Sequence, residues 1–577
     1  MKRAAFVFLA VTLLAWPVAA DPPSKVPKSL QLVEATVPEL QQALKTHLVT
    51  SQQLVQMYLN RIAAYSEAGP RLNAFIHVNA DALEVASARD SDRRHGRAHG
   101  PLFGVPVLLK DNINTEDMPT TAGSVALAGS IPPADAFITR KLREAGAIIL
   151  GKATLTEFAN FIAIGMPAGY SSLGGYGLNP YDPRPLPGGD GRPVLTPGGS
   201  SSGAGIAAAA NLVAVAVGTE TSGSILSPGT ANNVVGIKPT LGLVSRHGIL
   251  PITADQDTAG PLARTVTDAA ILLGVIAGFD LDDPATAACL ESHDGHDDGD
   301  RHDDEDDDGG KDNCHRDYTK FLKKDALRGA RIAVPRVPYW NGFSADRQQI
   351  MLDAIDALRQ EGAFVADPYE IPNQADISGF GICVSFPAPA NCSTVLMYGQ
   401  KHDLNNYLAE RPNAPVHTLG DIIAFNNAHA DVALKYGQAI FLAADQLDTS
   451  PGSADTQRFM DDRARDLALT RGGLNAVFDG PDGIEGTDDD FDAILFPQNR
   501  GAAAPAKAGY PSIVVPGGFV PPVAPVANPA PFGVTFTGRA FSEPRLIALA
   551  YAFEQATKHR QAPASAPPLP TDSVRRR

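Results

Sequence analysis

Short apolar runs alternate with helical stretches along most of the chain, and this alternation limits the possible folds more than any other feature. Apolar residues recur at helical spacing in Pro38–Leu48 and in Ser51–Tyr65, the second behind a Thr50/Ser51 cap. Such a pattern is typical of the α/β class. We expect a large twisted, mixed β-sheet with helices on both faces. The expected strands are Val105–Leu109, Ala147–Leu150, Leu212–Val217, Arg331–Val334, Ala493–Phe496 and Ser512–Val515.

The chain length allows either several domains or one large catalytic domain. Of its 577 residues 44% are hydrophobic, which suffices for a large packed core. Neither an internal repeat nor a linker rich in Pro, Gly and Ser divides the chain into self-sufficient halves. We therefore predict a single domain over residues 28–563, followed by a tail over 564–577 that contains Pro and Arg.

Residues 1–20 have the pattern of a removable export signal. Lys2 and Arg3 precede an apolar run, Ala4–Trp16, that is too short to span a bilayer, and Val18–Ala20 supplies the small residues of a cleavage site. No later stretch approaches the roughly 20 apolar residues of a membrane helix. The expected location is periplasmic or secreted. The net charge of −16 argues against a nucleic-acid partner.

Four cysteines form two pairs that are close in sequence, Cys289 with Cys314 and Cys383 with Cys392. In an oxidising compartment this spacing favours two disulfides, although four free thiols are an alternative that spacing alone does not exclude. Between the first pair lies an acidic stretch, residues 291–313, which we predict to be a solvated insertion loop.

Two acidic segments raise the question of a bound metal. Residues 291–313 include His293, His296 and His302 among carboxylates, and residues 479–490 could fold around Ca²⁺. Neither segment matches an EF-hand loop, because the required Glu is replaced by His315 in the first. We expect solvated loops here and no metal.

Two motifs give weak signals for a functional site. Gly146–Lys152 resembles a phosphate-binding loop, but Ala153 replaces the Mg²⁺-binding hydroxyl and the intervening residues are apolar, so a buried strand is favoured. Gly199–Gly203 satisfies the Gly-x-Ser-x-Gly pattern of a nucleophile elbow with Ser201 at its centre. An elbow follows a strand, whereas Pro187–Pro197 is too rich in Gly and Pro to be one.

A third segment, Thr196–Pro228, combines several features of a hydrolytic site. A glycine and serine loop precedes an Ala-rich helix at about residues 203–210, and the strand after it leads to a second loop, Thr221–Ser224. Consecutive N–H groups of that loop could surround a developing oxyanion. Serine needs a base, and a lysine held neutral by burial can provide one. Lys110, at the end of an apolar run, is placed for this role.

These residues resemble the amidase-signature hydrolases, and the resemblance covers nearly the whole chain after residue 20. Further matching elements are Gly104–Asn112, Asn179–Tyr181, Val235–Thr240, Asp257–Arg264 and Gly509–Ser512. The resemblance implies the amidase-signature fold and a Lys–Ser–Ser triad. In it Lys110 is the base, Ser200 is the bridging serine that follows a cis peptide, and Ser224 is the nucleophile. Backbone N–H groups of Thr221, Ser222, Gly223 and Ser224 would form the oxyanion hole. The family chemistry needs no metal or other cofactor.

The sequence departs from the commonest family pattern near the nucleophile. Ser222 stands where Gly is usual, Leu226 replaces a frequent Arg, and Glu220 replaces a common Asp. The motif Thr219–Ile225 is most similar to that of the peptide-amidase-like branch. This resemblance implies a secreted amidase acting on carboxamides, with C-terminal peptide amides as candidate substrates. Two alternatives stay open: an esterase or aryl acylamidase, with Ser201 as the esterase's candidate nucleophile, and an amide-binding protein without turnover. The amine and acyl preferences and the oligomeric state do not follow from the sequence.

Overall fold

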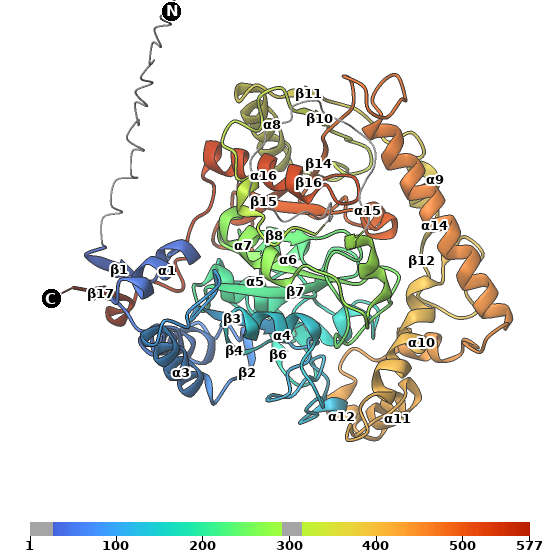
Figure 1. Ribbon diagram of the computed structural model, residues 1–577. Helices are drawn as coiled ribbons and strands as arrows, with labels where there is room; N and C mark the ends of the chain where they lie inside the picture. Colours follow the sequence, from blue (N-terminus) through green and yellow to red (C-terminus); the bar gives the residue numbers. More distant parts are fainter. Residues whose placement is uncertain (1–26, 291–313, 577) are drawn as a thin grey trace, which may run out of the picture.

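An 11-stranded mixed sheet forms the centre of the computed structural model, which describes residues 27–290 and 314–576 (Figure 1). The strand order is β11-β10-β14-β16-β15-β8-β9-β7-β3-β4-β2. The bounds are β2 Phe75–Val78, β3 Pro106–Lys110, β4 Ile148–Ala153, β7 Val215–Glu220, β8 Val235–Lys238, β9 Thr258–Ala263, β10 Arg331–Ala333, β11 Phe364–Ala366, β14 Ala493–Pro497, β15 Ser512–Val520 and β16 Ala530–Thr537.

All six strands expected from the sequence belong to this sheet, which confirms the predicted fold class. The apolar run that contains Gly146–Lys152 is the fully buried β4, as its composition indicated. Pairing is parallel for β7 with β3 and for β3 with β4, so the carboxyl ends of these three strands meet at one edge. That edge is where α/β folds place polar functional groups. The expected strand Leu212–Val217 begins later in the structure, at Val215. Residues 212–214 lie before the strand but are equally apolar and buried, so the sequence pattern placed its start too early.

Helices flank the sheet and pack against it. Helix α5 packs against β3, β4, β7 and β9, and α7 packs against β7, β8 and β9. The expected Thr50 cap is present, with Thr50 and Gln53 forming a capping box at α2. The helices are α1 Val37–Lys45, α2 Ser51–Arg61, α3 Ala82–Arg94, α4 Phe137–Glu144, α5 Ser202–Ala209, α6 Leu226–Ala231, α7 Val266–Ile276, α8 Ala345–Gln360, α9 Gln374–Gly379, α10 Val395–Ala409, α11 Leu419–Ala428, α12 Ala430–Ala433, α13 Ala439–Asp445, α14 Ala454–Phe478, α15 Ala503–Ala508 and α16 Glu543–Thr557.

A second apolar cluster lies beside the main core, at the lower right of Figure 1. It joins helices α10, α11 and α13 to residues that follow β4, including Phe158 and Phe161. Phe158 and Phe441 meet edge to face with their ring centroids 4.9 Å apart. None of the helices in the described ranges is both long and apolar enough to cross a bilayer.

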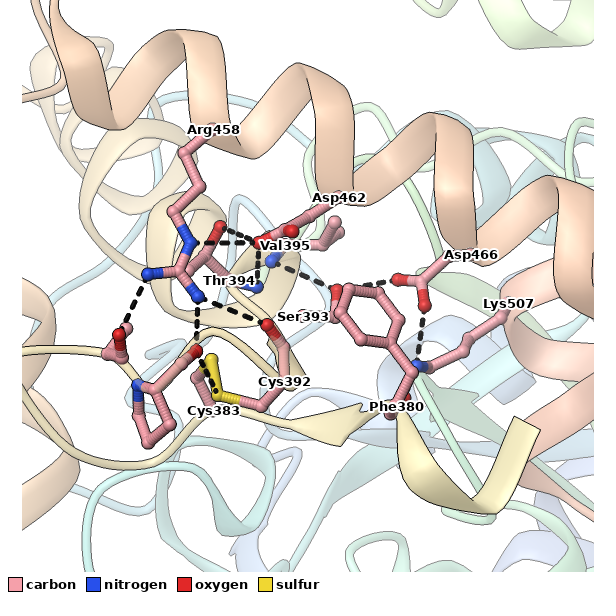
Figure 2. The surroundings of a disulfide bond; sticks show 12 residues. Phe380, Cys383, Cys392, Ser393, Thr394, Val395, Arg458, Asp462, Asp466 and Lys507 are labelled. Atoms are coloured by element: carbon pink, nitrogen blue, oxygen red, sulfur yellow. Dashed lines mark hydrogen bonds and ion pairs between the residues drawn. A yellow bond between two sulfur atoms is a disulfide. The ribbon is translucent and has the colours of Figure 1, made fainter. Parts of the chain in front are cut away.

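Both predicted disulfides are present, Cys289–Cys314 and Cys383–Cys392. The second closes the loop between the short strands β12 (Gly381–Ile382) and β13 (Cys392–Ser393), which pair with each other (Figure 2). Beside it, Ser393 donates to Asp466 of α14 over 2.6 Å, and Lys507 of α15 donates to the same carboxylate over 2.6 Å. This buried network fixes the disulfide loop, α14 and α15 to one another.

The two described ends of the chain meet in a small sheet. β1 (Ser29–Gln31) pairs antiparallel with β17 (Ser573–Arg575), at the left of Figure 1. The residues expected to form a tail, 564–577, therefore pack against the amino-terminal segment over most of their described length. Asp572 is fully buried against the equally buried Arg61, which also donates to the carbonyl groups of Ala210, Asn211, Ala566 and Pro567.

Removing Asp572 should destabilise the whole protein. Asp572→Ala leaves the buried Arg61 guanidinium without its counter-charge, and loss of one partner of such a pair typically costs about 3–5 kcal/mol. We expect a loss of this size in the free energy of unfolding measured by urea denaturation. The control is Asp356→Ala, because the Asp356–Arg359 pair is long, 3.7 Å, and largely exposed. Equal losses in the two variants would show that the buried Arg61–Asp572 pair contributes no more stability than an exposed pair.

Candidate active site

Lys110 is the last residue of β3, and its side chain is fully buried at the carboxyl edge of the sheet. Its Nζ lies 2.8 Å from Ser200 Oγ, 2.8 Å from Thr219 Oγ1 and 3.2 Å from the Thr219 carbonyl oxygen. Thr219 is on β7, the parallel neighbour of β3, so strand pairing alone brings it beside Lys110. Burial lowers the Lys110 pKa to about 7, against the opposing effect of the Asp257 and Glu220 carboxylates.

The three contacts of Nζ fit the three N–H donors of an ammonium ion, and they also fit the two donors and one lone pair of a neutral amine. An uncharged lysine has two N–H donors and one lone pair. The Thr219 carbonyl can only accept, and the Thr219 hydroxyl is also placed to accept. The lone pair is then left for the Ser200 hydroxyl proton. The arrangement suits a base that takes a proton from Ser200.

Ser200 lies in the loop before α5, where the Gly199–Ser200 peptide bond is cis. Its side chain is fully buried, and its carbonyl accepts from Thr156 N–H over 3.0 Å, just beyond β4. Gly198 has φ +68°, and a Cβ there would come within 2.6 Å of the Ser227 carbonyl oxygen. Glycine is therefore required where this loop crosses the start of α6.

Ser224 is on the loop that follows β7 and leads to α6. Its carbonyl accepts from Ser201 N–H over 3.2 Å, which joins the two serine-bearing loops. The side chains of Lys110 and Ser200 are inaccessible, whereas Ser224 is 8% exposed. Of the three residues, Ser224 is thus the one that a molecule arriving from solvent could reach.

Two buried carboxylates hold the Thr221–Ser224 loop in shape. Glu220 accepts the N–H groups of Gly223 and Ile225, each over 2.7 Å, and of Leu226 over 3.0 Å. Asp257 accepts from the Thr221 hydroxyl and from the N–H groups of Ile252 and Thr253, and burial raises its pKa to about 6. These hydrogen bonds fix the backbone of the loop at several points.

The Glu220 contact changes one expectation from the sequence. Four successive N–H groups, those of Thr221, Ser222, Gly223 and Ser224, were expected to face a developing oxyanion. The Gly223 N–H instead donates to Glu220, so it is already used. Gly223 itself has φ +85°, the left-handed conformation that turns the chain at this point. Thr221, Ser222 and Ser224 remain as the candidate donors.

Ser201 of the elbow-like motif and Lys152 of the phosphate-loop-like motif both make structural hydrogen bonds. Ser201 is fully buried; its hydroxyl donates to the Thr219 carbonyl over 3.0 Å and accepts from Thr219 N–H over 3.2 Å. It joins the loop to β7 and is not presented as a nucleophile. Lys152, the lysine of the phosphate-loop motif, is buried in β4 and donates to Thr120 Oγ1 over 2.7 Å.

Several residues that shape the site were given no role by the sequence analysis. Thr219 accepts from the Lys110 amine, Asn112 donates to Thr219 Oγ1 over 3.1 Å, and Glu220 and Asp257 order the Thr221–Ser224 loop. All of them lie within the stretches that carry the resemblance to amidase-signature hydrolases. The family resemblance therefore included these positions, but only the contacts in the structure show what each residue does.

Comparison with known proteins gives consistent matches. The family model named Amidase matches residues 53–547. A probable amidase of Arabidopsis thaliana is 37% identical over 546 residues, 93% of either chain. The crystal structure of the peptide amidase of Stenotrophomonas maltophilia has a TM-score of 0.76 and 39% identity, and the match covers 92% of this chain and 99% of that one. An amidase family protein of Bacillus anthracis has a TM-score of 0.77 and 33% identity, with 92% of each chain covered.

Glu220→Gln should weaken the structure around the site. The replacement exchanges one acceptor oxygen for an amide NH₂ group, so at least one of three buried N–H groups loses its partner. A buried unsatisfied group costs about 1–3 kcal/mol, and we expect this loss in the free energy of unfolding measured with urea. Glu67→Gln, at an exposed position, is the control. Unchanged stability in Glu220→Gln would mean that the carboxylate does not order the loop.

Proposed function

The chain belongs to the amidase family, and from this premise we propose that it hydrolyses carboxamides through Lys110, Ser200 and Ser224, with Ser224 as nucleophile. The single observation that supports the triad most is the 2.8 Å contact between the buried Lys110 amine and Ser200 Oγ. A buried lysine with a pKa of about 7 is uncharged in half of the molecules at neutral pH, so it can act as a base.

In the proposed reaction Ser224 Oγ attacks the carbonyl carbon of the amide. Its proton passes to Ser200, whose own proton passes to Lys110 Nζ. The tetrahedral intermediate collapses, the C–N bond breaks, and the departing amine takes a proton back along the same relay. Water then hydrolyses the Ser224 ester with the relay again accepting a proton. The products are a carboxylic acid and an amine or ammonia.

The oxyanion of the tetrahedral intermediate would accept hydrogen bonds from the N–H groups of Thr221, Ser222 and Ser224. Because Glu220 and Asp257 already fix the loop, these dipoles need little reorganisation when negative charge develops. Loss of a single donor of this kind commonly reduces kcat by about 10²–10³-fold.

We propose C-terminal peptide amides as the substrate class. The support is the 39% identity, over almost the full length of both chains, to an enzyme described as a peptide amidase. Leu226 stands where an Arg is frequent in the family, which removes a cation that a small acidic amide would need. Export through the segment 1–20, which lies outside the described residues, is part of this proposal. A panel of peptide amides, anilides and fatty amides compared by kcat/KM tests the substrate class.

Replacing the triad residues should abolish hydrolysis without unfolding the protein. Ser224→Ala removes the nucleophile and should leave no turnover above background. Lys110→Ala removes the base, a loss of about 10²–10⁴-fold in kcat. Ser202→Ala, in the same serine run, should remain active and is the matched control. Turnover retained by Ser224→Ala would contradict the proposal.

Active-site labelling distinguishes the proposal from its alternatives. A fluorophosphonate should modify Ser224 in the unmodified protein, as peptide mapping by mass spectrometry would show. Modification of Ser201 would favour the esterase reading, although its hydroxyl is engaged with Thr219. Absence of any modification would favour an amide-binding protein without turnover.

Hydrolysis should increase with pH through about 7. Below that value Lys110 is an ammonium ion and cannot accept a proton; above it the neutral amine predominates, because burial lowers its pKa to about 7. We expect kcat/KM, which reports the free enzyme, to be half-maximal near pH 7 and then to level off. Fluorescence should confirm that the protein stays folded across the range. A kcat/KM that falls as the pH rises through 7 would exclude Lys110 as the base.

A further inference from the structure

Three side chains that can bind a metal converge outside the proposed active site. They are His247, on the segment that follows Val244, and Asp280 and Asp282, on the segment that follows α7. The two segments lie side by side, because Gly278 N–H donates to the Leu243 carbonyl over 3.1 Å. One ligand atom from each of the three side chains lies within 4.8 Å of the others. Within the described ranges this is the one group of three or more His, Cys, Asp or Glu residues so arranged.

The distances at His247 do not fit a simple hydrogen bond. Its Nδ1 lies 3.6 Å from Asp282 Oδ2 and 3.8 Å from Asp280 Oδ2, too far for a protonated imidazole to donate to either. The same nitrogen is buried and has no hydrogen-bond partner. Two donors about 2.1 Å from a tetrahedral ion are about 3.4 Å apart. The observed spacing is close to that of ligands sharing one ion.

Asp280 is held in place for such a role. Its Oδ2 accepts from the Ser245 hydroxyl over 2.6 Å, and its Oδ1 accepts from Asp282 N–H over 3.1 Å. Ser245 Oγ also accepts from His247 N–H over 3.1 Å, so one hydroxyl orients both segments. Hydrogen bonds that orient metal ligands in this way are usual in metal sites.

The local charge favours a cation. His247 and Asp282 line a surface cleft of about 270 Å³, together with Asp283, Asp403 and Glu410. Among the described residues of the cleft, Arg246 is the one Lys or Arg, and Asp283 neutralises it. The carboxylates of Asp280 and Asp282 thus have no basic side chain among their described ion-pair partners except His247 itself.

We propose that His247, Asp280 and Asp282 bind one divalent transition-metal ion of the Zn²⁺ type, with water completing the coordination. One imidazole nitrogen with two carboxylate oxygens suits Zn²⁺, Co²⁺ or Ni²⁺, whereas Ca²⁺ and Mg²⁺ prefer oxygen ligands throughout. The ion would cross-link the segment before α7 to the segment after it. The acidic segment 479–490 offers no comparable group, since among the described residues only the ligand atoms of His247, Asp280 and Asp282 converge as a set of three or more.

Titration of the full-length protein, without a histidine tag, tests the site. Because any accessible imidazole can bind a transition metal, all proteins in this test carry Ser in place of His293, His296 and His302, which lie outside the described residues. Isothermal calorimetry with Zn²⁺, and visible absorption with Co²⁺, should then show one saturable equivalent. His247→Gln should weaken that binding at least about 100-fold. Asp282→Asn should weaken it too, and Asp282 is 66% exposed, so folding is not at risk.

His402→Gln is the matched control, because His402 also sits beside an aspartate, with its Nδ1 2.7 Å from Asp403, but has no third ligand. Zn²⁺ binding should be unchanged in that variant. Zn²⁺ should also raise the melting temperature of the protein with His247 intact and leave that of His247→Gln unmoved. No saturable binding, equal binding in His247→Gln, or Ca²⁺ binding that equals Zn²⁺ binding would each overturn the proposal.

Discussion

Burial of the Lys110 amine is the constraint on which the rest of the site depends. Taking an ammonium ion out of water is costly, so a lysine at this depth loses its proton readily. The parallel pairing of β3 with β7 supplies both Thr219 acceptors, and the loop before α5 supplies Ser200. Each of these partners depends on the strand order at the centre of the sheet. The long sheet is thus what allows the Lys110 amine to be buried beside these acceptors.

The loop after β7 is held by two carboxylates that are not exposed to solvent. Glu220 and Asp257 are both buried, and each accepts several N–H or hydroxyl groups. Their charges also oppose the desolvation of Lys110, and so keep its pKa from falling further. Glu220 fixes the loop by accepting the Gly223 N–H, one of the four groups that the sequence analysis expected to face an oxyanion.

The sequence predicted the fold well because the expected strands are buried on both faces and read as continuous apolar runs. Strand ends were less certain, as at Val215, since buried loops next to strands are equally apolar. Lys110 was named from its position at the end of an apolar run, and the separate roles of Ser200 and Ser224 came from family resemblance; the structure brings Lys110 to Ser200 directly. The contact of Thr219 with the Lys110 amine could not be predicted, because it depends on the pairing of β3 with β7. The hydrogen bond from Gly223 N–H to Glu220 could not be predicted either. Residues 564–577 were assigned to a tail from their Pro- and Arg-containing composition, and the sequence could not reveal that Asp572 pairs with Arg61, 511 residues away.

Distant segments also complete the surroundings of the nucleophile loop. A Cβ on Gly223 would lie 3.3 Å from Asn499 Nδ2 and 3.5 Å from Ala502 Cβ, so the start of α15 forms a wall of the loop. Through Lys507, α15 is tied to Asp466 of α14 and to the Phe380 carbonyl beside the Cys383–Cys392 loop (Figure 2). A covalent cross-link in the carboxyl-terminal half thus restrains, through buried hydrogen bonds, the wall that faces Gly223.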